Sequence, residues 1–133
     1  MGKQDFETPF NSHLAMADAE LSLLDIINAN LSNHEFAFLS ACQTAVGDGV
    51  TPDEMIRLAA GLQFTGVKSV IGTLWTISDA IAYLLVPEFY REFCAGGVMD
   101  CTKAARALHR GVLALAKKKV PLEERIVFIH IGI

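Results

Sequence analysis

Three nearly continuous apolar segments most constrain the fold of this chain. They span residues 36–41, 67–75 and 126–131, and each has the length of a buried β-strand. Segments with helical periodicity lie between them, so strands and helices alternate along the chain. Strands that are apolar on both sides have to be covered on both faces. The sequence therefore predicts an α/β domain with a mostly parallel β-sheet and helices on both faces.

The composition is that of one globular domain over residues 1–133, because 52% of the residues are hydrophobic and 20% are charged. The formal net charge of −4 argues against a nucleic-acid partner, which requires a basic face. The only basic run, residues 117–119, is interpreted as the solvated end of a helix. No apolar segment approaches the roughly 20 residues of a membrane span, so no membrane association is expected.

The cysteines favour a reducing, cytoplasmic setting. There are three of them, Cys42, Cys94 and Cys101, and no two form a CxxC pair. An odd count without such pairs fits neither a disulfide scaffold nor a zinc site. We therefore expect no metal and no organic cofactor, and we expect Cys94 and Cys101 to be packed thiols.

The first half of the chain contains several local signals. A short strand is predicted at residues 13–16, and Ser22 is expected to cap a helix over residues 23–31. The residues expected on the apolar face of that helix are Leu23, Leu24, Ile27 and Leu31. Thr51 and Pro52 predict the start of the next helix, which is expected to end at Gly66.

The second half continues the alternation. Ser78 and Asp79 begin a helix in which Pro87 should produce a kink or a restart, and Gly96 should stop it. Asp100 or Thr102 is expected to cap a further helix that runs to about Lys118. A helical turn at residues 121–125 and the last strand complete the prediction.

Cys42 stands where a predicted strand ends and a polar loop with Gly47, Asp48 and Gly49 begins. The carboxyl edge of a parallel sheet is where ligands and reacting groups gather. The residues alone leave two interpretations open: a nucleophile, or a small thiol buried as a hydrophobic residue.

A nucleophilic cysteine needs a base, and four histidines are available. His130 lies inside the last apolar strand and is interpreted as a core histidine whose ring is hydrogen-bonded. His109 is expected on a helix surface. His34 precedes the strand that leads to Cys42. At about 3.3 Å per residue it lies some 20 Å from the thiol, so it is excluded as the base. His13 is the only free candidate.

The segment LSACQTA at residues 39–45 resembles the CHAT family of caspase-like cysteine peptidase domains. The resemblance extends over nearly the whole chain. The other segments that carry it are residues 9–14, 21–23, 51–54, 59–62 and 69–75, Asp79, and residues 128–132.

The resemblance implies a caspase-like fold and a cysteine-type endopeptidase in which Cys42 attacks the peptide bond through a thioacyl intermediate. Gly2 and the backbone around Gln43 are then expected to support the oxyanion. The family's catalytic histidine precedes a glycine that Gly2 matches, and Met1 occupies the histidine's place. We therefore expect the back part of a CHAT domain, without its N-terminal strands and inactive on its own.

The substrate implied is a protein or peptide. Asp48 and Asp79 are candidates for recognising a basic residue beside the scissile bond, although turn and helix-start roles explain them better. Trp75 is either a pocket wall or a core residue. The resemblance also implies tetratricopeptide-type repeats in the parent protein.

Two other functions stay open. The chain is alternatively a non-catalytic caspase-like interaction module, which binds partners or a second copy through an exposed sheet edge. The other alternative is that the chain is a different α/β hydrolase, in which Cys42 pairs with His13.

Overall fold

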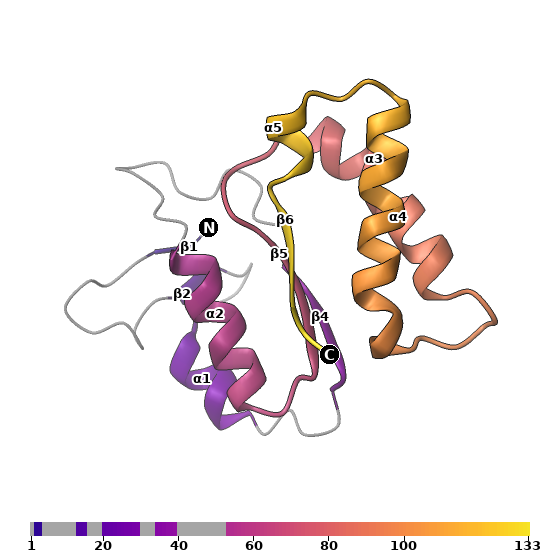
Figure 1. The fold of residues 1–133 in the computed structure, drawn as a ribbon. Coiled ribbons are helices and arrows are strands. Elements are labelled where there is room, and N and C mark those ends of the chain that lie inside the picture. The colour runs from indigo at the N-terminus through magenta and orange to yellow at the C-terminus, as the bar shows by residue number, and fades with distance from the viewer. Residues whose placement is uncertain (1, 4–12, 16–19, 30–33, 40–52) are drawn as a thin grey trace.

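The computed structural model describes residues 2–3, 13–15, 20–29, 34–39 and 53–133 (Figure 1). The strands are β1 (Gly2–Lys3), β2 (His13–Ala15), β3 (Glu20–Ser22), β4 (Phe36–Phe38), β5 (Ser69–Thr73) and β6 (Phe128–Gly132). The helices are α1 (Leu23–Asn28), α2 (Asp53–Phe64), α3 (Asp79–Phe93), the 3-10 turn η2 (Cys101–Lys103), α4 (Ala104–Lys117) and α5 (Leu122–Arg125). The predicted alternation of strands and helices is confirmed.

The central sheet has the order β4-β5-β6. Strands β4 and β5 are parallel, whereas β6 runs antiparallel to β5. The expectation of a mostly parallel sheet is therefore corrected: in the described part of the chain the sheet is mixed. The reason is that two long helices, α3 and α4, connect β5 to β6. Because α3 and α4 run in opposite directions, α4 ends near the end of the sheet at which β5 ends. Strand β6 therefore starts at that end and runs antiparallel to β5.

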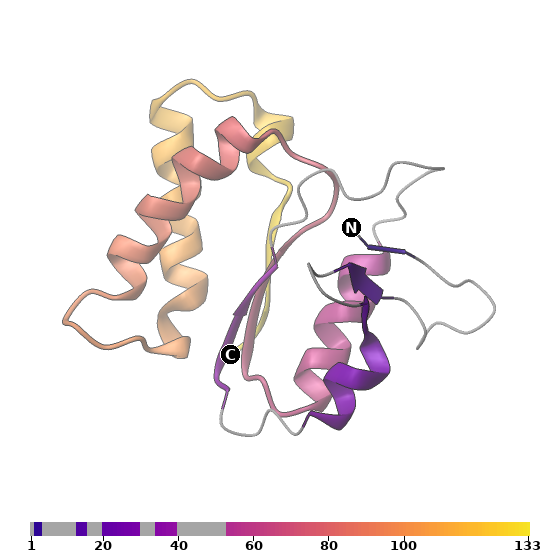
Figure 2. The same cartoon turned by 180° about the vertical axis from the view of Figure 1, so that it is seen from behind.

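Helices cover both faces of this sheet, as predicted (Figures 1 and 2). The face toward α3 and α4 carries the larger hydrophobic core, which includes Ile71, Leu85 and Leu115. Phe36 and Phe38 of β4 contribute aromatic contacts to this core, and the ring centroids of Phe36 and Phe93 are 4.4 Å apart. This aromatic packing fixes β4 against α3.

Among the described side chains, the opposite face carries a smaller core toward α1 and α2. Its buried residues are Ile26, Ala59, Leu62, Val67 and Val70. Val70 and Ile71 are neighbours in β5 and point to opposite faces, as alternation along a strand requires. The nearly continuous apolar sequence of β5 is therefore explained by burial on both sides.

A second sheet, of order β1-β2-β3, lies at the start of the chain and is antiparallel throughout. The strand predicted at residue 13 is confirmed as β2, whose His13 pairs with Lys3 and Ser22. Strands β1 and β3 were not predicted, because two or three residues are too few to show an alternating pattern.

The predicted cap of α1 is confirmed. The Ser22 side chain accepts a hydrogen bond from the Asp25 backbone amide, and the Asp25 carboxylate accepts one from the Ser22 amide. The expected apolar face is wrong at Leu24, which is 47% exposed, whereas Ile26 is 7% exposed and belongs to the core. The helix ends at Asn28, before the predicted position, and Leu31 lies outside the described residues.

Helix α3 continues through Pro87, so of the two predicted outcomes, a kink or a restart, the restart is wrong. Proline removes one backbone hydrogen bond and disfavours a helix interior. However, Pro87 is exposed, and the buried residues Ile81, Leu85, Phe89 and Phe93 recur every four positions on the other side of the helix. Packing of that continuous side against the core holds the helix together.

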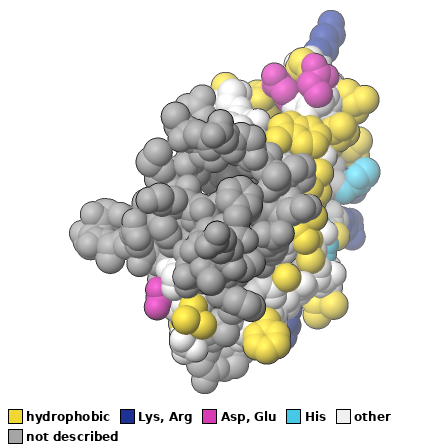
Figure 3. Space-filling model, turned by 90° about the vertical axis from the view of Figure 1, so that its left-hand side faces the viewer, with side chains coloured by type: hydrophobic (Ala, Val, Ile, Leu, Met, Phe, Trp, Pro, Cys, Tyr) yellow, Lys and Arg dark blue, Asp and Glu magenta, His cyan; other side chains and the backbone are white. Residues whose placement is uncertain are grey.

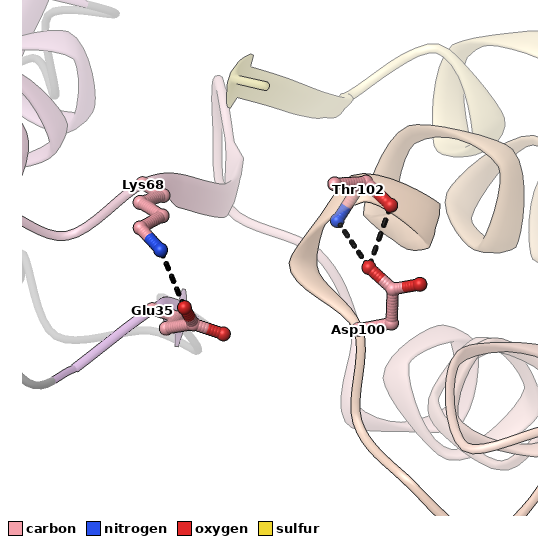
Figure 4. A network of polar contacts seen from close by, with 4 residues as sticks. All are labelled: Glu35, Lys68, Asp100 and Thr102. Carbon is pink, nitrogen blue, oxygen red and sulfur yellow. Dashed lines mark hydrogen bonds and ion pairs between the residues drawn. The ribbon is translucent and has the colours of Figure 1, made fainter.

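The turn between α3 and α4 follows the prediction. Gly96 and Gly97 both adopt positive φ after the end of α3. The Asp100 carboxylate accepts hydrogen bonds from the backbone amide of Thr102, at 3.0 Å, and from its hydroxyl, at 2.6 Å (Figure 4). Asp100 therefore caps η2, which leads directly into α4.

Candidate active site

The parallel pair β4 and β5 brings the carboxyl ends of two strands to one edge of the sheet. The Leu39 amide donates a hydrogen bond of 2.8 Å to the Ile71 carbonyl, which extends the pairing beyond β4. Leu39 precedes Cys42 by three positions in the sequence. Cys42, Gln43 and Asp48 lie outside the described residues. The structure thus describes the β5 side of this edge and the approach to Cys42.

Thr73 ends β5 at this edge. Its side chain is buried, and its Oγ1 has no hydrogen-bond partner among the described residues. On the same strand, the buried Ser69 hydroxyl does have a partner, the ring of His130. Thr73 was not predicted as a site residue. The one feature of the sequence that could have indicated it is a hydroxyl side chain within an apolar strand.

Trp75 follows β5 and is 39% exposed, so it is not part of the hydrophobic core. The Leu74 amide donates a hydrogen bond of 2.9 Å to the Val127 carbonyl, which extends the contact between the two segments one residue beyond the paired strands β5 and β6. Ile126, which precedes Val127, is itself 53% exposed. Large apolar side chains are therefore accessible just after β5 and just before β6.

Helix α5 extends this accessible surface. Leu122 is exposed and lies one helical turn before Ile126, whose amide donates to the Leu122 carbonyl. Glu123 and Glu124 follow Leu122 on the same short helix. Figure 3 shows acidic and hydrophobic side chains side by side at the upper end of the molecule, the end that carries α5 in Figure 1.

Asp79 is the first residue of α3, directly after the N-cap residue Ser78, and its side chain is exposed. The predicted helix-start position is therefore confirmed. A carboxylate there interacts favourably with the positive end of the helix dipole. Among the described residues, no ion pair engages Asp79.

The histidines do not gather at this edge in the described part of the chain. His34 and His109 are exposed, and His109 lies on the surface of α4 as expected. The side chain of His13 is not described. The backbone of Gly2, in β1, pairs with Leu14 of β2.

His130 is a hydrogen-bonded histidine of the sheet, as predicted. Its Nε2 lies 2.9 Å from Oγ of Ser69, at the amino end of β5. Burial lowers the pKa of the His130 ring, and a hydrogen bond with the Ile133 backbone partly opposes that shift. Ser69 is fully buried, so this Ser–His contact holds β5 to β6 and is not accessible to a substrate.

The remaining cysteines are packed thiols, as expected: Cys101 is buried and Cys94 is half-buried, and both are free. Within the described residues, no group of three His, Cys, Asp or Glu side chains is arranged to hold a metal ion. The helices of the described part are all too short or too polar to cross a membrane.

Comparison with known families gives one match. The family model of the CHAT domain matches residues 2–127, which is most of the chain. No curated protein matches the sequence. The matched region includes the approach to Cys42, strand β5 and the exposed edge that carries Trp75 and Asp79.

Proposed function

Because the chain belongs to the CHAT domain family, which is related to caspase-like peptidases, we propose that it is a caspase-like cysteine-type endopeptidase domain with Cys42 as its nucleophile. The observation that supports this best is the parallel β4–β5 pair. It directs the chain toward Cys42 from the carboxyl edge of the sheet, where reacting groups gather in α/β folds.

In the proposed reaction the Cys42 thiolate adds to the carbonyl carbon of the scissile peptide bond. Backbone amides at Cys42 and Gln43, with support from Gly2, stabilise the resulting oxyanion. The C–N bond then breaks, the amine leaves with a proton, and a thioester remains on Cys42. Water hydrolyses the thioester and regenerates the thiol.

Two of these steps need a general base or acid, which normally contributes about 10²–10⁴-fold to the rate. Resemblance to the family assigns that role to a histidine at the position of Met1. We therefore propose that the 133-residue chain has weak peptidase activity unless an imidazole is supplied.

The proposed substrate is a protein or peptide with a basic residue beside the scissile bond. Asp48 and Asp79 provide carboxylates for a Lys or Arg side chain. The exposed Trp75, four residues before Asp79 in the sequence, provides an apolar side chain for the same substrate. No cofactor is needed for this chemistry.

Chemical rescue with imidazole tests this function. The chain is incubated with a fluorogenic peptide that carries Arg at the cleavage position, with increasing imidazole, beside the Cys42→Ala variant. We expect cleavage to rise with imidazole in the parent chain and to be absent in the variant. Equal cleavage by both proteins would refute Cys42 as the nucleophile.

A second test measures the alkylation rate of each cysteine against pH by mass spectrometry, with the buried Cys101 as an internal reference. We expect Cys42 to titrate near the ordinary thiol pKa of about 8.5. A pKa well below this value would show that the chain activates its own nucleophile. The His13→Ala variant would then identify or exclude His13 as the base.

A non-catalytic interaction module is the second candidate, and one observation favours it. Glu35 and Leu39 make their backbone hydrogen bonds to β5, so the alternate residues Phe36 and Phe38 direct their backbone groups to the other side of β4. No other described strand pairs with that side. Such an edge can accept a strand from a partner or from a second copy. Concentration-dependent dimerisation in sedimentation experiments would support this candidate, and a monomer at all concentrations would contradict it.

A further inference from the structure

The charges of this acidic chain are distributed unevenly. Residues 101–119 contain six of the eleven Lys and Arg residues and none of the fifteen Asp and Glu residues. The rest of the chain therefore carries five basic and fifteen acidic residues. The basic segment comprises η2, α4 and the residues just after α4.

Most of these basic residues lie in one row along α4. Lys103, Arg106, Arg110, Leu113 and Lys117 follow one another at alternating spacings of three and four, which keeps them on one face of a helix. All five are exposed. We call this row the basic stripe. It extends about 21 Å, at about 1.5 Å of rise per residue.

The other face of α4 is packed into the protein. Its buried residues are Ala104, Ala107, Leu108, Gly111 and Leu115. A Cβ at Gly111 would lie 3.3 Å from Cγ of Leu85, so α3 and α4 approach closely there. This packing holds α4 in place and leaves the residues of the basic stripe exposed.

The two ends of the basic stripe affect the stability of α4 differently. Lys103 is the N-cap residue and Arg106 lies in the first turn, which contains no acidic residue and where positive charge opposes the helix dipole. Lys117 lies in the last turn, where a cation is favourable. Like charges three or four positions apart, such as Arg106 and Arg110, also repel each other. The stability of α4 therefore explains Lys117 but not Arg106 and Arg110.

Only part of the stripe is neutralised within the described part of the protein. Lys103 Nζ lies 3.3 Å from Asp100 Oδ2, and Arg106 Nε lies 3.6 Å from Glu92 Oε1. Arg110 and Lys117 make no ion pair with any described residue. Leu113 lies between them and is 43% exposed. The accessible end of the stripe is therefore an apolar side chain with a cation one turn away on each side.

We propose that the basic stripe of α4 binds an acidic amphipathic helix of a protein partner. The spacing of the stripe is that of a coiled-coil seam, and its positive charge is complementary to carboxylates that flank an apolar row. The exposed Leu113, between Arg110 and Lys117, favours a protein helix with apolar side chains over a phosphate backbone. The acidic remainder of the chain would repel an extended polyanion such as a nucleic acid. This proposal does not depend on Cys42 being a nucleophile.

The test uses the full chain and a synthetic helical peptide of about three heptads, with leucines at the a and d positions and glutamates at e and g. The glutamates keep the peptide from pairing with itself near pH 7. Binding is followed by NMR titration of the labelled chain. We expect shift changes at Arg106, Arg110, Leu113 and Lys117, and an affinity that falls as salt rises from about 50 to 500 mM.

The test variant is Arg106→Gln/Arg110→Gln/Lys117→Gln. We expect it to bind about tenfold more weakly, as the loss of three exposed ion pairs would give, and Leu113→Ala to weaken binding independently. A matched control, Lys68→Gln/Arg91→Gln/Lys118→Gln, removes the same charge elsewhere and should keep its affinity. Circular dichroism should show both triple variants folded, since all six side chains are exposed.

Several outcomes would overturn the proposal. Equal affinity of the test and control variants would show that the stripe is not the binding site. Equal binding of a scrambled peptide or of polyglutamate would show general attraction of polyanions. Binding of duplex DNA or of phosphatidylserine vesicles at α4, without binding of the acidic helix, would identify a different class of partner.

Discussion

Two buried hydroxyls on β5 have opposite environments. Ser69 Oγ contacts the ring of His130, whereas Thr73 Oγ1 has no partner in the part of the chain that the structure describes. A buried polar group without a hydrogen bond costs about 1–3 kcal/mol, and a hydrogen-bonded one contributes about 1 kcal/mol. Thr73 ends β5 at the carboxyl edge of the sheet, two residues before Trp75.

Replacement of these hydroxyls should therefore have opposite effects. Thr73→Val keeps the shape and removes the unpartnered oxygen, so we expect an increase of about 1 kcal/mol in the free energy of unfolding. Ser69→Ala should decrease it by about 1–2 kcal/mol because the His130 ring loses its partner. Urea denaturation measures both. A destabilised Thr73→Val variant would show that this hydroxyl is hydrogen-bonded in solution.

His130 should make stability depend on pH. Burial lowers the pKa of its ring in the folded state, so the unfolded chain binds a proton more readily than the folded chain. The contribution is fully present above the unfolded pKa of about 6.5. It is lost as pH falls below that value, and the loss levels off below the folded pKa. Denaturation between about pH 5 and 8 should show this slope, which His130→Gln should reduce.

The comparison of the parent chain with His130→Gln decides the origin of this pH dependence. An unchanged slope in the variant would show that the dependence does not originate in the His130 ring.

The ends of elements depend on particular backbone conformations. Gly132 ends β6 with φ of +123°, and a Cβ at that position would lie 2.1 Å from the Lys68 carbonyl oxygen. Gly97 also has positive φ, +81°, but nothing lies within 4 Å of its Cβ position. Comparing substitutions at the two glycines therefore separates the cost of positive φ from the cost of a steric clash. The close approach at Gly132 is what allows the last residues to pair alongside the start of β5.

Alanine substitution at these glycines should differ in cost. Gly97→Ala should destabilise the chain by about 1–2 kcal/mol, the usual penalty for a side chain at positive φ. Gly132→Ala should cost more than Gly97→Ala, because the Lys68 backbone also has to move. Thermal and urea unfolding of the two variants measure the difference. Equal costs would show that the end of β6 moves aside without penalty.

At the scale of the whole molecule, the two faces of the central sheet are unequal. Of the side chains that the structure describes, the α3–α4 side contains most of the fully buried large ones, including Phe89 and Phe93, whereas the α1–α2 side has a smaller core. Strand β5 lies between β4 and β6 and is buried along its whole length. The α3–α4 layer and β5 together should therefore be the most stable part of the fold.

Hydrogen exchange tests this hierarchy. Local opening requires less free energy where fewer apolar contacts are lost. We expect the amides of β5, α3 and the buried face of α4 to exchange slowest and those of α1 to exchange much faster. Native-state exchange followed by mass spectrometry gives this order. Equal protection of α1 and α3 would indicate that the two layers unfold as one unit.

Much of the fold was predictable from local signals. Ser22 before a helix, Asp100 before η2 and the Gly96–Gly97 pair after α3 act through bonds and dihedrals within a few residues, and each was confirmed. The candidate site was predictable only in part. The helix-start position of Asp79 follows from the sequence, but the exposure of Trp75 could be read only from the tertiary structure.

The sequence by itself determined the α/β class, the order of the elements and the membership in the CHAT family, because apolar periodicity, caps and motifs are local properties. Only the tertiary structure decided the direction of β6, the continuity of α3 through Pro87 and the contact between Ser69 and His130. These features depend on residues far apart in the chain. Packing against a shared core brings such residues together, and no pattern within one segment records it.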